Sequence, residues 1–208
     1  MSFTTSERPV NGLPCLIVII GSTRPGRTGA AIGQWFAGRA RKYRTFDVAV
    51  ADLAAVNLPM LDEPNHPRLR QYLHQHTRDW SAVIGRADAV VFVTPEYNHG
   101  YPATVKNAID FLHHEWANKP VGFVSYGGVS AGTRSVQQLL PVVTAVGMLP
   151  VVDMVNIPFV KQFLSDNGQL VANNIMDQAA DAMLDELLRF HRVLRRASAE
   201  PVPELRGR

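Results

Sequence analysis

Five short apolar runs, each followed by a segment with helical spacing, constrain the fold of this chain more than any other feature. The first run, Leu16–Ile20, contains only leucine, isoleucine and valine, which is typical of a parallel strand buried on both faces. Strands that alternate with helices predict one doubly wound sheet with right-handed crossovers. The predicted strands are Leu16–Ile20, Phe46–Ala51, Ala89–Val93, Val121–Ser125 and Leu149–Val155.

The segments between the predicted strands have the pattern of helices that cover both faces of a sheet. Five strands favour the order 2-1-3-4-5, so the predicted fold class is α/β, a flavodoxin-like three-layer sandwich with a five-stranded parallel sheet. A proline-rich segment, 53–68, predicts an irregular excursion. We expect an N-terminal extension (1–13), one folded domain (14–196) and a flexible C-terminal tail (197–208). The predicted helices are Gly29–Tyr43, Thr77–Arg86, Pro102–Glu115, Gly132–Val146 and Asn174–Arg196.

The composition argues against several classes of protein. A net charge of +3 over 208 residues is too mild to predict a nucleic-acid partner. No apolar run approaches the roughly 18 residues that cross a bilayer. The stretch Met1–Pro9 also lacks the basic-then-apolar pattern of a secretion signal, and Cys15, the one cysteine, cannot form an internal disulfide. We therefore expect a cytoplasmic protein that neither binds nucleic acid nor spans a membrane.

Loop one (21–29) joins the first predicted strand to the first predicted helix and has the composition of an anion site. Its glycines let backbone N–H groups converge, and the helix start adds partial positive charge. An ordinary capped turn is the alternative. The spacing also fits a P-loop, but an arginine stands where that motif has lysine, and the dinucleotide signature G-x-G-x-x-G is absent. The residues expected to hold a phosphate are Ser22, Arg24, Arg27, Thr28 and Gly29.

Loop two (94–102) and loop three (125–132) follow the third and fourth predicted strands. Parallel strands bring their carboxyl ends to one edge, where open α/β sheets bind ligands. Prolines stiffen loop two, and the glycines of loop three allow a planar ligand to approach their N–H groups. Plain strand-to-helix connections are the alternative for both loops. The residues expected to flank a flat ring are Pro95, Glu96, Tyr97, Asn98, Ser125, Tyr126, Gly127 and Gly128.

The sequence does not favour a metal site. His113 and His114 are adjacent, so they cannot share one helix face, and most other histidines are scattered through a proline-rich region. Lys106 and Asp110 are four residues apart on a predicted helix, which predicts a local ion pair. We therefore predict no metal ligand set.

Taken together, the loops resemble those of the NAD(P)H-dependent FMN reductases, a family that includes chromate, quinone and azo reductases. Gly-Ser-x-Arg follows the first strand, Pro-Glu-Tyr-Asn the third and Tyr-Gly-Gly the fourth, and Lys-Asn-Ala-Ile-Asp occupies 106–110. The similarity extends over 16–155. It implies non-covalently bound FMN, with its phosphate in loop one and its isoalloxazine ring between loops two and three.

The resemblance also implies a function. NADPH or NADH would transfer a hydride to N5 of FMN, and the electrons would pass to free flavin, a quinone, an azo compound, a metal oxyanion or another small-molecule acceptor. The flavin would carry the chemistry, so no catalytic side chain is assigned. A homodimer or homotetramer is expected, and a flavin-dependent monooxygenase is a candidate partner. Tyr101, Phe111, Leu112 and Trp116 are expected either to form a subunit surface or to be buried in the monomer. A flavodoxin-type electron carrier that serves a protein partner is the alternative function.

Overall fold

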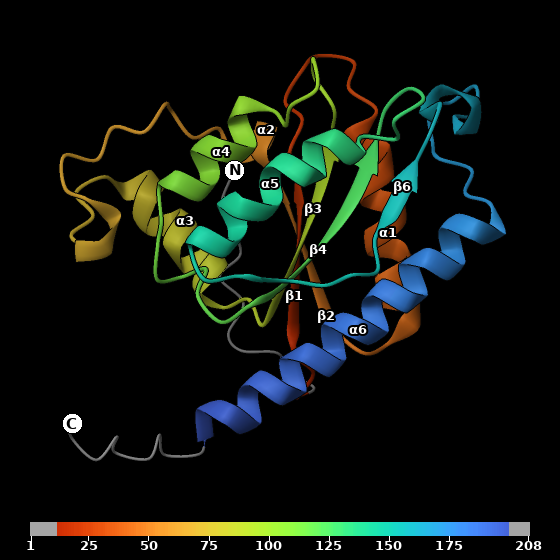
Figure 1. Ribbon diagram of the computed structural model, residues 1–208. Coiled ribbons are helices and arrows are strands. Elements are labelled where there is room, and N and C mark those ends of the chain that lie inside the picture. The colour runs from red at the N-terminus through yellow and green to blue at the C-terminus, as the bar shows by residue number, and fades with distance from the viewer. Residues whose placement is uncertain (1–11, 200–208) are drawn as a thin grey trace.

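One parallel sheet lies between two layers of helices in the computed structural model, which describes residues 12–199 (Figure 1). Neighbouring strands pair in the order β2-β1-β3-β4-β5, which confirms the predicted order, and β6 pairs with β4 as a sixth strand where five were predicted. All these pairings are parallel, so the carboxyl ends of the strands meet at one edge, at the top of Figure 1. The strands are β1 (Cys15–Ile20), β2 (Asp47–Asp52), β3 (Ala89–Pro95), β4 (Pro120–Tyr126), β5 (Leu149–Pro150) and β6 (Val155–Ile157).

Alternate strand residues pack into two apolar clusters, one on each face of the sheet. Ile17 and Phe92 belong to the cluster covered by α3, α4 and α5, whereas Leu16 and Val91 belong to the cluster covered by α1 and α6. The alternation follows from the pleat of a strand. Because both faces are buried, the strands appear in the sequence as continuous apolar runs. The helices are α1 (Gly29–Tyr43), α2 (Leu53–Val56), η1 (Pro67–Leu69), α3 (Gln75–Gly85), α4 (Ala103–Asp110), α5 (Thr133–Ala145), η2 (Val160–Phe163) and α6 (Asn174–Ala199).

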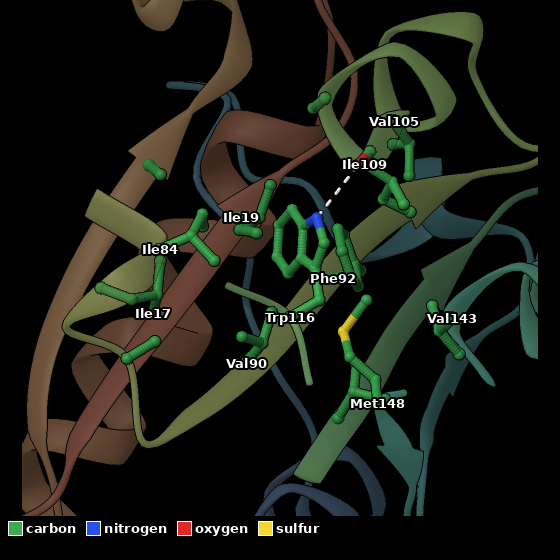
Figure 2. Packing of buried hydrophobic residues seen from close by; sticks show 14 of the residues in the cluster. Ile17, Ile19, Ile84, Val90, Phe92, Val105, Ile109, Trp116, Val143 and Met148 are labelled. Atoms are coloured by element: carbon green, nitrogen blue, oxygen red, sulfur yellow. Dashed lines mark hydrogen bonds between the residues drawn. The ribbon is translucent and has the colours of Figure 1, made fainter. Parts of the chain in front are cut away.

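Helix α4 ends at Asp110, so the predicted helix was too long at its C-terminal end. Two indole groups explain the early end. Trp80 Nε1 donates to the carbonyl oxygen of Ala108 at 2.8 Å. Trp116 Nε1 donates to that of Ile109 at 3.0 Å, as Figure 2 shows. The last carbonyl groups of a helix lack intrahelical partners, and here side-chain donors satisfy two of them. The chain turns after α4 so that Trp116 can enter the core.

The predicted strand Leu149–Val155 is wrong as a single element. β5 pairs with the start of β4, β6 pairs with its end, and the residues between them leave the ladder. Pro150 has no N–H group to continue the ladder. The N–H groups of Val152 and Asp153 instead donate to the carboxylate of Glu186 on α6, each at 3.0 Å. The Glu186 carboxylate, from the helix layer that packs on the sheet, thus accepts the hydrogen bonds that a neighbouring strand would otherwise accept.

The proline-rich excursion after β2 is fastened to α4 and contains two short helices, α2 and η1, where the sequence predicted irregular structure. Asn107 Nδ2 donates to the carbonyl oxygen of Pro59 at 2.7 Å, and its Oδ1 accepts from the N–H of Leu61 at 2.9 Å. On the same helix Lys106 Nζ donates to Asp110 at 2.8 Å, which confirms the predicted ion pair. Helix α4 therefore holds the excursion in place.

Three of the residues considered for a subunit surface belong to the core. Phe111, Leu112 and Trp116 have exposed fractions of 0%, 1% and 0%, and Tyr101 packs against the same cluster. Their apolar character serves the monomer, so burial, one of the two expected alternatives, is the outcome for Phe111, Leu112 and Trp116.

Helix α6 extends to Ala199, beyond the predicted end at Arg196. The rest of the predicted tail (200–208) and most of the predicted N-terminal extension (1–11) lie outside the described residues. None of the described helices is long and apolar enough to cross a membrane.

Candidate functional site

Hydrogen bonds fasten loops one, two and three to one another at the carboxyl edge of the sheet. The hydroxyl oxygens of Ser22 in loop one and Tyr97 in loop two lie 2.5 Å apart. The N–H of Glu96 in loop two donates to the carbonyl oxygen of Tyr126 in loop three at 3.3 Å. The predicted convergence of the three loops is therefore present in the structure, and Figure 1 shows them side by side above β1, β3 and β4.

Loop one presents backbone N–H groups that have no acceptor. Within residues 12–199, nothing accepts from the N–H groups of Ser22, Thr23 or Arg24. Thr28, which precedes α1, makes no side-chain capping bond, and the first turn of α1 contains no acidic residue. A helix start without a cap or a carboxylate attracts an anion, because its free N–H groups carry partial positive charge.

The two arginines of loop one differ in their surroundings. Arg27 forms an ion pair with Asp52 at the end of β2, and its buried Nε has no partner among the described residues. Arg24 is exposed, and no described carboxylate pairs with its guanidinium group. We had expected both arginines to hold a phosphate. Arg24 is the one with an uncommitted charge, whereas Asp52 already neutralises much of the charge on Arg27.

Tyr126 is the last residue of β4, but its hydroxyl group lies at loop one. A Cβ atom added to Gly29 would overlap the Tyr126 hydroxyl oxygen and would stand 3.3 Å from its Cζ. Burial raises the pKa of Tyr126 well above its ordinary value, so the side chain stays a neutral phenol. Gly29 is thus required by a side chain from loop three, and the Tyr126 hydroxyl lies beside the start of α1.

Glu96 ties loop two to α5 instead of facing an open slot. Its side chain is only 7% exposed, and it accepts from Arg134 Nε at 2.7 Å and from the Ser130 hydroxyl at 2.8 Å. Burial alone would raise the pKa of Glu96, but the hydrogen bonds from Arg134 and Ser130 outweigh burial and lower it. Glu96 is therefore a carboxylate that fixes the position of loop two.

We expect Glu96→Gln to destabilise the protein by about 1 kcal/mol at pH 7 and by less in acid. Because the folded-state pKa of Glu96 is lowered, the stability that its charge contributes is present above the unfolded-state pKa. That stability is lost as the pH falls through the folded-state pKa. Urea unfolding at pH 7 and at about pH 3 checks this difference. Asp166→Asn, which changes an exposed turn residue, is the control, and an equal loss at both pH values would contradict the prediction.

Pro95 and Ser125 are also held by contacts within the protein. Pro95 ends β3 and lies opposite Tyr126 in the ladder. Ser125 is fully buried, and its hydroxyl lies 2.8 Å from both the Ala131 carbonyl oxygen and Asn156 Oδ1. Neither residue is open to a ring, although both were expected to flank one.

The tip of loop two is a tight reverse turn. Tyr97 and Gly100 exchange backbone hydrogen bonds of 2.8 and 3.0 Å, and the two residues between them, Asn98 and His99, have φ values of 51° and 71°. Gln138 Nε2 donates to the carbonyl oxygen of His99 at 2.9 Å. This geometry gives a rigid tip. It leaves Asn98 exposed and the Tyr97 side chain 39% exposed.

Only one of the two glycines expected to donate to a ring is free to do so. The N–H of Gly127 donates to the carbonyl oxygen of Ile157 at 3.2 Å. The N–H of Gly128 has no acceptor within residues 12–199, and a Cβ placed on Gly128 would meet no atom within 4 Å. Gly128 is therefore exposed, and its N–H is free to bind a ligand.

Three residues that shape the site were not predicted from the sequence. Asp52 pairs with Arg27, Arg134 pairs with Glu96, and the Thr104 hydroxyl donates to the carbonyl oxygen of Gly21 at 2.6 Å. A signal for Asp52 was available, since a residue at the carboxyl end of β2 must lie beside the end of β1. The other two lie inside helices, where no local pattern indicates which way their side chains point. No group of three metal-ligating side chains occurs among the described residues.

The family comparison agrees with this geometry. The family model described as NADPH-dependent FMN reductase matches residues 14–162, which include all three loops. The chain belongs to the NADPH-dependent FMN reductase family.

Two curated relatives and one solved structure show how far this family likeness extends. An NAD(P)H-dependent FMN reductase of Schizosaccharomyces pombe is 42% identical over 62% of this chain, and the match spans 66% of that protein, just under two thirds of its length. An FMN-dependent NADPH-azoreductase of Staphylococcus saprophyticus is 25% identical over 84% of this chain and 93% of its own. FerB, a flavoenzyme NAD(P)H:(acceptor) oxidoreductase from Paracoccus denitrificans, superposes with a TM-score of 0.70 at 20% identity, over 86% of this chain and 99% of that chain. This structural likeness supports the fold.

Proposed function

We propose that this protein binds FMN and catalyses the NAD(P)H-dependent reduction of small-molecule acceptors. The observation that carries the proposal is an uncapped helix start, with the unpaired Arg24 beside it, at the sheet edge where the exposed Tyr97 and Gly128 also lie. An anion site and exposed groups that can contact a ring, at the same sheet edge, suit a ligand that joins a phosphate to a flat ring.

The residues of loop one fit a phosphate monoester. Free N–H groups at Ser22, Thr23 and Arg24 are donors, as are the helix start after Thr28 and the Arg24 guanidinium group. The buried, unpartnered Nε of Arg27 is a further donor at this site. Because these donors carry full or partial positive charge, the chemistry of the donor set favours a dianion. We therefore assign phosphate binding to Ser22, Arg24, Thr28 and Gly29, with Arg27 contributing from its pair with Asp52.

Tyr97, Asn98 and Gly128 are our candidates for contacts with the ring. The half-exposed Tyr97 offers an aromatic face, Asn98 offers an amide, and Gly128 offers an N–H to a ring carbonyl. The remaining predicted residues, Pro95, Glu96, Ser125, Tyr126 and Gly127, hold these groups in place through bonds within the protein.

FMN, when bound, supplies the two-electron chemistry between NAD(P)H and an acceptor. The protein contributes position and electrostatics: loop one binds the phosphate, and the reverse turn of loop two and Gly128 orient the ring. Tyr126 remains uncharged beside the phosphate because burial raises its pKa. We assign no catalytic side chain.

An azoreductase among the relatives supports small-molecule acceptors, among which free flavin, quinones, azo compounds and metal oxyanions remain proposals. We propose that both NADPH and NADH can serve as the hydride donor. A flavodoxin-type carrier is disfavoured, because the family model that matches the chain is a reductase model.

The test is to add FMN to flavin-free protein, record the visible spectrum and then add NADPH or NADH without oxygen. We expect FMN to bind, the yellow absorbance to bleach and menadione to restore it. Binding without bleaching would overturn the reductase proposal and favour an electron carrier. Protein that stays colourless in excess FMN would overturn both.

We further infer a cytoplasmic homodimer or homotetramer, for which a flavin-dependent monooxygenase is a possible recipient of reduced flavin. With Phe111, Leu112 and Trp116 buried, a subunit surface must use other residues. Light scattering of the FMN-loaded protein measures its mass in solution, and a monomer would contradict the oligomer.

A further inference from the structure

A pocket lined by arginines lies at the amino edge of the sheet, opposite the three loops. It has a volume of about 430 Å³ and is bordered by Arg44, which follows α1, by Arg192 and Arg195 of α6, and by the segment that leads into β1. None of the described residues that line it is acidic. Figure 1 shows the C-terminal half of α6 below the sheet and the three loops above it. Because β1 has six residues, at about 3.3 Å each, the pocket and loop one are roughly 20 Å apart.

The arginines of this pocket have no carboxylate partner. Within residues 12–199, no Asp or Glu forms an ion pair with Arg44, Arg192 or Arg195. Arg192 and Arg195 are three residues apart on α6, so they are neighbours on one helix face, where like charges repel. The partial negative charge of a helix C-terminus attracts cations only within the last turn, and Arg192 lies about two turns before the end of α6. A bound anion would relieve the repulsion.

His191 and Thr45 add uncharged polar groups to the same pocket. His191 is only 7% exposed. Burial lowers its pKa, and the positive charges of Arg195 and Arg192 lower the pKa further, against the opposite effect of Asp88. Asp88 Oδ1 lies 3.9 Å from His191 Nδ1, but the same carboxylate also accepts from a backbone N–H of β1 at 2.8 Å. The Thr45 hydroxyl is buried without a hydrogen-bond partner among the described residues, which is uncommon in a folded protein.

We infer that this pocket binds a small anion with a diphosphate group, such as inorganic pyrophosphate or a nucleoside diphosphate. The planar guanidinium group matches the oxygens of a phosphate through paired hydrogen bonds. A single phosphate carries about two negative charges at neutral pH, fewer than the guanidinium charges that line the pocket, so a diphosphate balances them better. The volume lies within the range of pockets that hold small molecules.

This inference goes beyond the proposed reductase function and does not depend on it. The pocket and the three loops lie at opposite edges of the sheet, so an anion bound beside α6 would not compete with a flavin for the same groups. The ligand would therefore be a second ligand of the protein.

The test is to titrate the full-length protein with pyrophosphate in a calorimeter, with FMN in excess so that flavin fills loop one. We expect one pyrophosphate to bind per chain. Arg195→Gln, which keeps a good helix former in α6, should weaken this binding roughly tenfold, the loss of one charge-assisted contact. Changing Arg192 to Gln as well should weaken it roughly a hundredfold. Arg70→Gln is the matched control, because Arg70 is an exposed arginine outside the pocket, and it should leave the affinity unchanged.

ADP, titrated in parallel, distinguishes the two sources of a diphosphate. Tighter binding of ADP than of pyrophosphate would identify a nucleotide, and equal affinities would identify the diphosphate group alone; the pocket stands in both cases. Pyrophosphate should also raise the melting temperature of the unmodified protein more than that of Arg195→Gln. If neither ligand binds, or if Arg195→Gln and Arg70→Gln weaken binding equally, the inference is wrong. If the protein fails to bind FMN, the proposed function fails, and the effect of Arg195→Gln on pyrophosphate binding still decides this inference.

Discussion

Replacing Gly29 by alanine is expected to weaken FMN binding roughly a hundredfold and to destabilise the protein by about 1–3 kcal/mol. The added Cβ would overlap the Tyr126 hydroxyl oxygen, and Tyr126 cannot move aside because its side chain is only 4% exposed. Either the start of α1 or the end of β4 must shift. Both movements disturb the N–H groups proposed to bind the phosphate. Titration with FMN followed by fluorescence, together with urea unfolding, measures the two effects.

The same helix supplies the control. Gly38 also lies within α1, but a Cβ placed there meets no atom within 4 Å. Alanine is the better helix former, so Gly38→Ala should stabilise the protein by up to about 1 kcal/mol and leave FMN binding unchanged. Adding Tyr126→Phe to Gly29→Ala removes the overlapping oxygen and should recover much of both losses. If Gly29→Ala behaves like Gly38→Ala, the close approach of Tyr126 to α1 is not a requirement of the site.

The strand order could be predicted from the sequence because it depends on short-range patterns. A strand buried on both faces needs a continuous apolar run, and the runs of β1, β3 and β4 have almost no polar interruption. The end of α4 and the division between β5 and β6 could not be predicted. They depend on Trp116, which caps a helix from beyond its end, and on Glu186, which replaces a strand partner from another layer. Such partners are distant in sequence, and no local pattern marks them.

The candidate site was predicted in its location but not in its division of roles. The three loops were found because parallel strands must deliver them to one edge. Whether a side chain there is free or committed depends on residues from other elements. Arg134 and Ser130 engage Glu96, and Asp52 engages Arg27. The composition of a loop reports which groups are present, whereas the surrounding helices and strands decide which of them can still bind a ligand.

Arg24→Ala is expected to weaken FMN binding ten- to hundredfold while leaving riboflavin binding unchanged. A charge-assisted hydrogen bond to a phosphate contributes about 1.5–3 kcal/mol, and riboflavin lacks the phosphate. Arg24 is the residue to change because its guanidinium group has no described carboxylate partner, whereas removing Arg27 would also leave Asp52 unpaired. Measuring both dissociation constants by flavin fluorescence separates the phosphate contact from the ring contact.

Arg196→Ala removes an equally exposed arginine from the far end of α6 and controls for net charge. It should change neither dissociation constant. If Arg24→Ala weakens the binding of FMN and of riboflavin equally, Arg24 contributes to ring binding. Loop one then does not bind the phosphate through Arg24. If Arg24→Ala changes neither, the N–H groups of Ser22, Thr23 and the start of α1, with Arg27, bind the phosphate without Arg24. That result would remove Arg24 from the charge recognition of this site.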